Sequence, residues 1–145
     1  MNEHYGYILL SDVKWWNKLC ERRERKFNSF VRRNKVGPLE TKKLLFYVKR
    51  PLMQLRGVAD FLERLTGDYK ELWRSYGAET CLKSFHEYIN FLKGRRTVTF
   101  IRFTNFRELE NPVPVNVLRN ILVVKRMPQG GKYVDEETVK VLVGE

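Results

Sequence analysis

Four segments of the sequence are dense in β-branched and aromatic residues, and their spacing limits the folds open to the chain. They span residues 4–10, 43–50, 55–64 and 97–106, of which the last, TVTFIRFTNF, is the longest. In a doubly wound parallel sheet helices alternate regularly with strands, whereas here residues 55–64 follow residues 43–50 after a turn at Pro51. The pattern therefore predicts an α+β domain built on a small curved sheet or barrel.

The first expected helix follows the first strand, and Ser11 or Asp12 is suited to be its N-cap. The apolar residues that recur near one face of this helix are Val13, Trp16, Cys20, Phe27 and Val31. The charged string RRER at positions 22–25 interrupts this stripe, so the helix either breaks there or stays exposed.

Helices are also expected in the second half of the chain. Asp68 is suited to begin one that stops at Gly77, and Thr80 is suited to begin another that stops at Gly94. Residues 117–123 are expected to form a short helix or turn.

Four further residues mark boundaries and irregularities. Pro112 and Pro114 are expected to break the chain after the strand at 97–106, and Asp135 is expected to cap the last helix. Gly57 lies inside a β segment, where glycine indicates a bulge or a close approach of the backbone to another group.

The length and the apolar content bound the class of protein. The chain has 145 residues, which suits a single domain spanning residues 1–145. It contains no run of about 18 apolar residues, so no transmembrane helix is expected. The N-terminal sequence MNEHYGYILLSDV has an acidic start and a short apolar stretch, unlike a signal peptide. These features predict a cytoplasmic protein with no membrane partner.

The charge of the chain is strongly positive and unevenly distributed. The sequence holds 28 Lys and Arg residues against 17 acidic residues, a net charge of +11. Residues 14–50 contain 13 of the basic residues and three acidic ones, a net charge of +10. A merely solvated charged face, as in thermophile proteins, would have more acidic residues interspersed. A concentrated basic surface attracts polyanions through counterion release, so the distribution favours nucleic acid as the partner.

Motifs for catalysis and metal binding are not found. There is no GxSxG, HExxH or P-loop, and Cys20 and Cys81 are far apart with no CxxC and no paired histidine. Both thiols are expected to be buried, with a disulfide as the alternative. His86 has only helical neighbours such as Lys83, so it is not expected to act as an acid or a base. The sequence predicts no catalytic residue, no metal and no cofactor, and favours binding over catalysis.

Two adjacent tryptophans are expected to have different roles. On a helix, the side chains of Trp15 and Trp16 point about 100° apart, so both cannot lie on one narrow buried stripe. Trp16 fits the apolar face. Trp15 lies near the edge of that face between Lys14 and Lys18, where its ring could stack on a base. The equally supported alternative is that the side chain of Trp15 packs at the open end of the barrel and closes it.

Further candidate nucleic-acid-binding residues lie on loops and strands. Basic residues before the turn at residues 37–38, at the end of the next β segment and beside the glycines at 130–131 can reach phosphates. Tyr47 is a candidate cleft wall, and Trp73 could close an aromatic cage, although packing is its expected role. The full predicted site is Trp15, Lys14, Lys18, Arg32, Arg33, Lys35, Tyr47, Lys49, Arg50, Trp73 and Lys132.

Three stretches of the sequence resemble the PUA-like superfamily, which includes the ASCH, EVE and YTH domains. YGYILLSDVKWW resembles the first strand and helix of EVE and YTH members, and LLFYVKRPLMQLRGVADFLE resembles a pair of strands in such domains. FRELENPVPVNVLRNILVVKRMPQGGKYVDEETVKVLV resembles the C-terminal part of archaeal PUA-like proteins. The G-x-K-x-x-E-x-R string of typical ASCH domains is absent, so no ASCH-specific residue is carried over. The resemblance implies a PUA-like bent β-barrel flanked by helices, which binds RNA or a modified nucleobase in a cleft beside the first helix.

Three functions are compatible with these observations. The favoured one is a nucleic-acid-binding module. RNA is preferred to duplex DNA because no recognition helix is evident and aromatic stacking is typical of proteins that bind single strands. The second is an RNA-processing enzyme, a ribonuclease, on the same fold, and the third is a protein-interaction domain with a basic face. Salt-dependent RNA binding distinguishes the first two from the third, and cleavage of RNA without metal distinguishes the second from the first.

Overall fold

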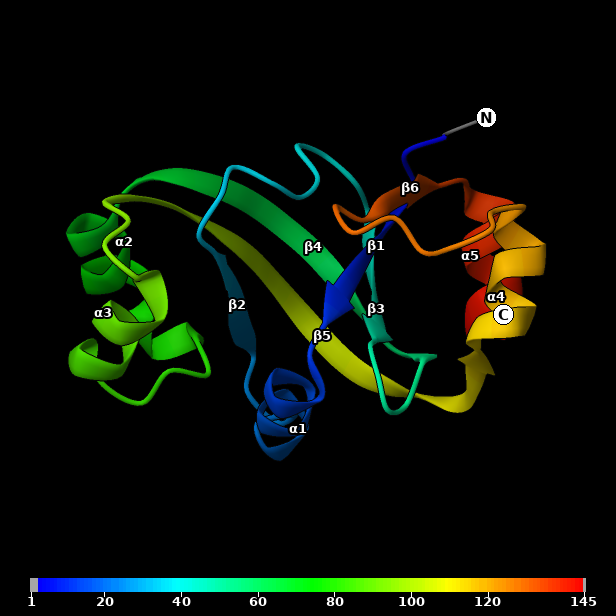
Figure 1. Cartoon of the computed structure of the whole chain (residues 1–145), viewed down its shortest axis with the longest axis horizontal. Coiled ribbons are helices and arrows are strands. Elements are labelled where there is room, and N and C mark those ends of the chain that lie inside the picture. The colour runs from blue at the N-terminus through cyan, green and yellow to red at the C-terminus, as the bar shows by residue number, and fades with distance from the viewer. Residues whose placement is uncertain (1–2, 145) are drawn as a thin grey trace.

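The computed structural model describes residues 3–144 and contains one six-stranded sheet flanked by helices (Figure 1). The strands are β1 (Gly6–Ser11), β2 (Phe27–Arg32), β3 (Lys43–Val48), β4 (Gln54–Asp68), β5 (Thr97–Pro114) and β6 (Lys132–Val134). The helices are α1 (Val13–Glu21), α2 (Tyr69–Tyr76), the short 3-10 helix η1 (Gly77–Glu79), α3 (Phe85–Leu92), α4 (Val115–Leu122) and α5 (Glu136–Val143). Within the described residues no helix has the length and apolar character needed to cross a membrane.

The sheet has the strand order β2-β5-β4-β3-β1-β6, in which β1 runs parallel to β3 and all other neighbours are antiparallel. The long strands β4 and β5 curve together across the molecule, with α2 and α3 at one end and α4 and α5 at the other (Figure 1). Among residues 3–144, β2 and β1 do not pair, and Arg32 Nη2 instead donates to the carbonyl of Leu10 at 2.7 Å. The predicted α+β class and bent barrel are confirmed, in an open form.

The first predicted helix breaks at the charged residues 22–25, as one of the two alternatives predicted, and the part expected beyond them is wrong. α1 ends at Glu21, and Phe27 and Val31, expected on its apolar face, belong instead to β2. The charged residues 22–25 end the helix. The following segment pairs antiparallel with β5, where Phe27 lies opposite Thr104. This pairing satisfies the backbone of a segment rich in aromatic and β-branched residues, which suits a strand better than an extended helix.

Two other boundaries differ from the prediction. Thr80 does not begin a helix: its hydroxyl donates to a backbone carbonyl of η1 at 2.8 Å, and α3 follows the later N-cap Ser84. β5 does not stop before the prolines but continues to Pro114. Pro112 is tolerated in the strand because β2 pairs only with residues 99–104, so this part of β5 lies at an edge.

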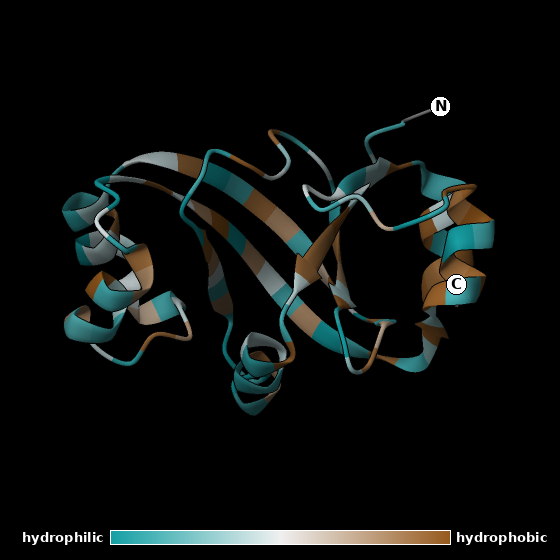
Figure 2. Cartoon of the chain, in the orientation of Figure 1, coloured by the Kyte–Doolittle hydropathy of each residue, from teal (hydrophilic) through white to brown (hydrophobic). Residues whose placement is uncertain are grey.

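Apolar side chains are buried on both faces of the sheet, and Figure 2 shows polar and apolar residues alternating along β4 and β5. One cluster includes Trp16 of α1 and Phe46. A second includes Tyr47 and Leu118, which belongs to α4. A third includes Tyr88 of α3. The helices therefore pack on different parts of the sheet. α1 packs through Trp16 and lies beside the gap between β1 and β2.

The contact of Trp16 with Gly57 fixes α1 against the sheet. Trp16 is 3% exposed, so its predicted place in the core is confirmed. A Cβ on Gly57 would lie 2.6 Å from Cη2 of the indole, and the pairing of β4 shifts its register between Leu55 and Gly57. The predicted bulge and close approach at Gly57 are both confirmed.

A charged network ties η1 to the sheet. Arg102 donates through Nε and Nη2 to the two carboxylate oxygens of Glu79, each at 2.9 Å, and through Nη1 to Glu63 at 2.6 Å. Ser29 Oγ also donates to Glu79 at 2.9 Å. Burial raises the pKa of Glu79, but the hydrogen bonds from Arg102 and Ser29 outweigh it and leave this pKa below its ordinary value.

We expect Glu79→Gln to destabilise the protein at neutral pH and to have little effect in acid. A carboxyl group with a depressed pKa stabilises the fold above its unfolded pKa, about 4.3 for Glu, and the contribution is lost as the pH falls through the folded value. Urea unfolding of wild type and variant at about pH 7 and about pH 3 measures this difference. Glu137→Gln, at an exposed position on α5, is the control. An equal loss of stability at both pH values would contradict the prediction.

Candidate nucleic-acid interface

A cleft opens on the side where the sheet is not closed, between α1, β1, β2 and the loop before β6. Its volume is about 420 Å³, within the range of about 300–1,000 Å³ typical of ligand sites. We name it the basic cleft, and its lining residues are Leu9, Leu10, Asp12, Trp15, Phe30, Val31, Arg32, Arg33, Asn34, Val36, Gly37, Lys49, Phe91, Gln129 and Gly130.

Trp15 lies at the centre of a group of cations and rings. The ammonium groups of Lys14 and Lys18 lie 4.9 Å and 5.1 Å from the centroid of its ring. Phe91 of α3 meets the same ring edge to face at 5.6 Å. Lys18 is also held by Glu87 at 3.4 Å, so α1 and α3 are joined by one ion pair and one aromatic pair. Trp15 is only half-buried and faces the basic cleft.

Two arginines at the end of β2 cover the other rings of the cleft. The guanidinium carbon of Arg32 lies 4.6 Å from the centroid of Phe30, and that of Arg33 lies 5.2 Å from the centroid of Phe91. Burial lowers the pKa of Arg32, which nevertheless stays charged because an arginine does not deprotonate in proteins. Arg33 makes no hydrogen bond or ion pair within the described part of the chain, so its donors are available to a ligand.

Lys49 and Asp12 form an ion pair in the basic cleft. The ammonium and carboxylate groups are 3.0 Å apart, and both side chains are at least half exposed. Asp12 is the N-cap residue of α1, but its side chain accepts no capping hydrogen bond. It is the one carboxylate among the lining residues that the structure describes. An exposed ion pair contributes only about 0–1 kcal/mol, so an anionic ligand can compete with Asp12 for Lys49.

The loop before β6 forms another wall and is held by Tyr7. The hydroxyl of Tyr7 donates to the carbonyl of Gly130, and the amide of Gly131 donates to the carbonyl of Pro128 at 3.1 Å. Gly131 has a φ of 91°, and a Cβ there would meet the Tyr7 hydroxyl at 2.5 Å, so the position requires glycine. The turn places Gln129 at the cleft, where its amide offers a donor and an acceptor to a base edge.

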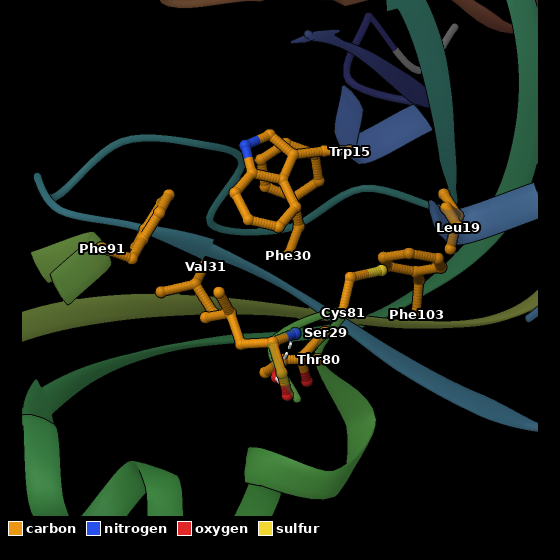
Figure 3. Close-up of a pocket in the computed structure, with 10 residues that line it drawn as sticks. Trp15, Leu19, Ser29, Phe30, Val31, Thr80, Cys81, Phe91 and Phe103 are labelled. Atoms are coloured by element: carbon orange, nitrogen blue, oxygen red, sulfur yellow. Dashed lines mark hydrogen bonds between the residues drawn. The ribbon is translucent and has the colours of Figure 1, made fainter. Parts of the chain in front are cut away.

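The rings of the basic cleft also line a smaller, apolar pocket of about 50 Å³. Trp15, Phe30, Val31 and Phe91 belong to both. Figure 3 shows Trp15, Phe91 and Val31 directed toward this common space. The small apolar pocket therefore adjoins the aromatic wall of the cleft.

Neither cysteine offers a reactive thiolate. Cys20 and Cys81 are free and half-buried, so the disulfide alternative is not formed. Burial raises the pKa of both thiols, that of Cys20 to about 11. A thiol in that state is protonated at neutral pH and is a poor nucleophile.

The structure brings six of the eleven predicted site residues together. Trp15, Arg32, Arg33 and Lys49 line the basic cleft, and Lys14 and Lys18 lie over the ring of Trp15.

The other five predicted residues lie elsewhere. Tyr47 is 4% exposed and packs in the cluster that includes Leu118, because both faces of β3 are covered. Trp73 stacks on Tyr88 with ring centroids 4.6 Å apart, which matches packing rather than a cage. The remaining three do not line the cleft and are Lys35, Arg50 and Lys132.

Sequence reasoning missed several lining residues. Phe30 was missed because its segment was assigned to a helix, whereas the structure places it in β2. Phe91 is not one of the buried residues of α3, which are Tyr88 and Leu92, and a large aromatic residue outside that buried face is a signal for a second contact surface. Asn34 and Gln129 carry no signal of their own, since polar loop residues are common.

The bent, open sheet flanked by helices agrees with the fold predicted from the sequence. The sequence matches no protein-family model, and a search of curated proteins finds no match. Among solved structures, ASCH from Zymomonas mobilis is similar with a TM-score of 0.79 and 19% identity over 97% of this chain and 95% of that one. A single-residue variant of that protein gives a TM-score of 0.76 and 19% identity over 99% and 98% of the two chains. The N-terminal domain of McrB from Staphylothermus marinus gives 0.54 at 14% identity, over 100% of this chain and 98% of that one.

Proposed function

We propose that the chain binds nucleic acid, with RNA preferred to duplex DNA, in the basic cleft beside α1. The observation that carries this proposal is the alternation of cations and rings around one cleft: Trp15, Phe30 and Phe91 each have a cation over the ring. Bases stack on aromatic faces with about 1–3 kcal/mol each, and Arg and Lys bind phosphates. PUA-like domains are generally RNA- or DNA-binding modules, which supports the same class of ligand.

An unpaired nucleobase, plain or modified, is the part of the ligand that this cleft suits. The rings lie inside a cleft rather than on a flat platform, so a base has to leave its stack to reach them. Single-stranded RNA meets this requirement more easily than a duplex. Asn34 and Gln129 lie at the same cleft, where their amides can hydrogen-bond to a base edge.

The test is the salt dependence of binding to a labelled single-stranded RNA, measured by fluorescence anisotropy. We expect the double variant Arg33→Gln/Lys49→Gln to bind more weakly and to have a flatter dependence of log K on log salt. Each phosphate contact to a single strand contributes a slope of about 0.7, so the loss of two contacts should lower the slope by about 1.4. Duplex DNA of the same length should bind more weakly than the RNA.

Two further variants complete this test: a control with the same change of charge outside the cleft, and a variant that is expected to strengthen binding. Lys83→Gln/Lys140→Gln removes the same charge from exposed positions outside the cleft and should keep the wild-type slope. Asp12→Asn keeps a good N-cap residue but removes the carboxylate beside Lys49, so it should strengthen binding. If the cleft and control variants bind alike, the basic cleft is not the site.

A further inference from the structure

A second group of cations lies at the end of the sheet from which Arg33 enters the cleft. Arg32 is paired with Thr99 across β2 and β5, so the end of β2 lies beside the beginning of β5. The residues just before β5, at 93–96, are KGRR. The amide of Tyr69 donates to the carbonyl of Arg96 at 2.9 Å, which places the first turn of α2 next to them. We name the cations of this region, Lys70, Lys93, Arg95 and Arg96, the distal basic surface.

The cations of the distal basic surface have no carboxylate partners. All four are exposed, and none forms an ion pair within the part of the chain that the structure describes. Asp68 is the nearby carboxylate, and it already accepts the amides of Lys70 and Glu71 at 3.0 Å and 3.2 Å as the N-cap of α2. The other cation of α2, Arg74, is instead paired with Glu71 at 2.8 Å. Unpaired cations gathered in one place leave a positive potential that attracts anions.

The distal basic surface is joined to the basic cleft through α3. Phe91 lines the cleft beneath Arg33, and Lys93 follows it by two residues, so their Cα atoms are at most about 7 Å apart. Lys93 and Gly94 have φ values of 51° and 85°, and this left-handed turn ends α3 and leads the chain to β5. A cation at a helix C-terminus is explained by the helix dipole, which accounts for Lys93 but not for cations beyond the last turn.

We propose that the distal basic surface binds the phosphates of a nucleic-acid strand that continues out of the basic cleft past Arg33. The proposal rests on the proposed function and names the path of the strand, from the cleft across the paired ends of β2 and β5 to the connection between α3 and β5. A continuing single strand fits better than a separate ligand because Arg33 borders both regions. The bound strand is then longer than the segment that the cleft alone holds.

The test compares two RNA lengths, about four and about 16 nucleotides, the limits of the usual site sizes of single-strand-binding folds. The variant is Lys93→Gln/Arg95→Gln/Arg96→Gln, and the control with the same charge change is Lys83→Gln/Lys125→Gln/Lys140→Gln. For the distal variant we expect short-RNA affinity within twofold of wild type, and a salt slope for the long RNA lower by about 2, since three contacts of about 0.7 each are lost. Arg33→Gln/Lys49→Gln should weaken binding at both lengths.

The possible outcomes separate the two proposals. A wild-type slope for the long RNA in the distal variant overturns the path of the strand and leaves the cleft proposal intact, provided the cleft variant weakens both lengths. A distal variant that weakens the long RNA while the cleft variant binds like wild type shows an independent site, which overturns both proposals. Loss of short-RNA binding in the distal variant also overturns the path, because these cations would then act on the cleft itself. Thermal unfolding of each variant confirms that it is folded.

Discussion

Trp16→Ala should lower the free energy of unfolding by about 3–5 kcal/mol, a large share of the stability of a small domain. The reason is the position of the ring, which is 3% exposed and packs against Phe106 at 5.5 Å and Phe46 at 6.3 Å between centroids. Loss of the indole leaves a cavity where α1 meets the sheet. Urea unfolding monitored by far-UV circular dichroism measures the loss, and Trp16→Phe should recover part of it.

A double-mutant cycle with Gly57 tests whether the ring and the bulge form one unit. Gly57→Ala should destabilise the wild type because the new Cβ would lie 2.6 Å from the indole of Trp16. In the Trp16→Ala background the same substitution should cost much less, because the ring is gone. Gly67→Ala, in the same strand, is the control, since no atom lies within 4 Å of its Cβ position. Additive effects of Trp16→Ala and Gly57→Ala would contradict the contact.

Trp15→Ala should have a different effect, with a larger loss in binding than in folding. The ring is half-buried and makes one aromatic pair, with Phe91 at 5.6 Å, so the expected loss of stability is about 1 kcal/mol. The expected loss of affinity for single-stranded RNA is about 1–3 kcal/mol if a base stacks on the ring. Trp15→Phe should keep part of this affinity, because a smaller ring still stacks. Anisotropy titrations under conditions where both proteins are folded measure the difference.

Trp73→Ala is the matched control for Trp15→Ala. Trp73 is also half-buried and belongs to the same apolar cluster, but its ring stacks on Tyr88 away from the basic cleft. It should lose stability and keep the RNA affinity of the wild type. If Trp15→Ala and Trp73→Ala lower the affinity equally, the loss reflects general destabilisation, and the stacking role of Trp15 is wrong.

Local patterns in the sequence were sufficient for features that depend on neighbours along the chain. The 100° separation of adjacent residues on a helix placed Trp16 in the core and Trp15 at its edge, as observed. Asp68 and Asp135 cap their helices as predicted, and Asp135 accepts the amide of Thr138 at 2.8 Å. These features need only a short segment and its backbone, so the residues of that segment determine them.

The assignment of residues 27–32 depended on a partner far along the chain. FNSFVR has residues that suit either a helix face or a strand, and the choice was made by β5, whose residues 99–104 offered an edge to pair with. Tyr47 illustrates the same limit on burial. Alternation along β3 indicates two faces, but the sequence does not reveal that helices and loops cover both of them.

The composition determined that the protein is basic, and the tertiary structure decided which cations meet at one site. Arg33 and Lys49 reach the basic cleft although they follow different strands, β2 and β3, whereas Lys35 and Arg50, their near neighbours in sequence, do not line it. Gln129 reaches the same cleft because β6 pairs with β1 and Tyr7 holds the preceding turn. The physical reason is that helix caps and helix faces follow from interactions between residues a few positions apart. The cleft instead forms because β1 and β2, which follow each other along the chain, pair with later strands and not with each other, so only the complete sheet determines where that gap lies.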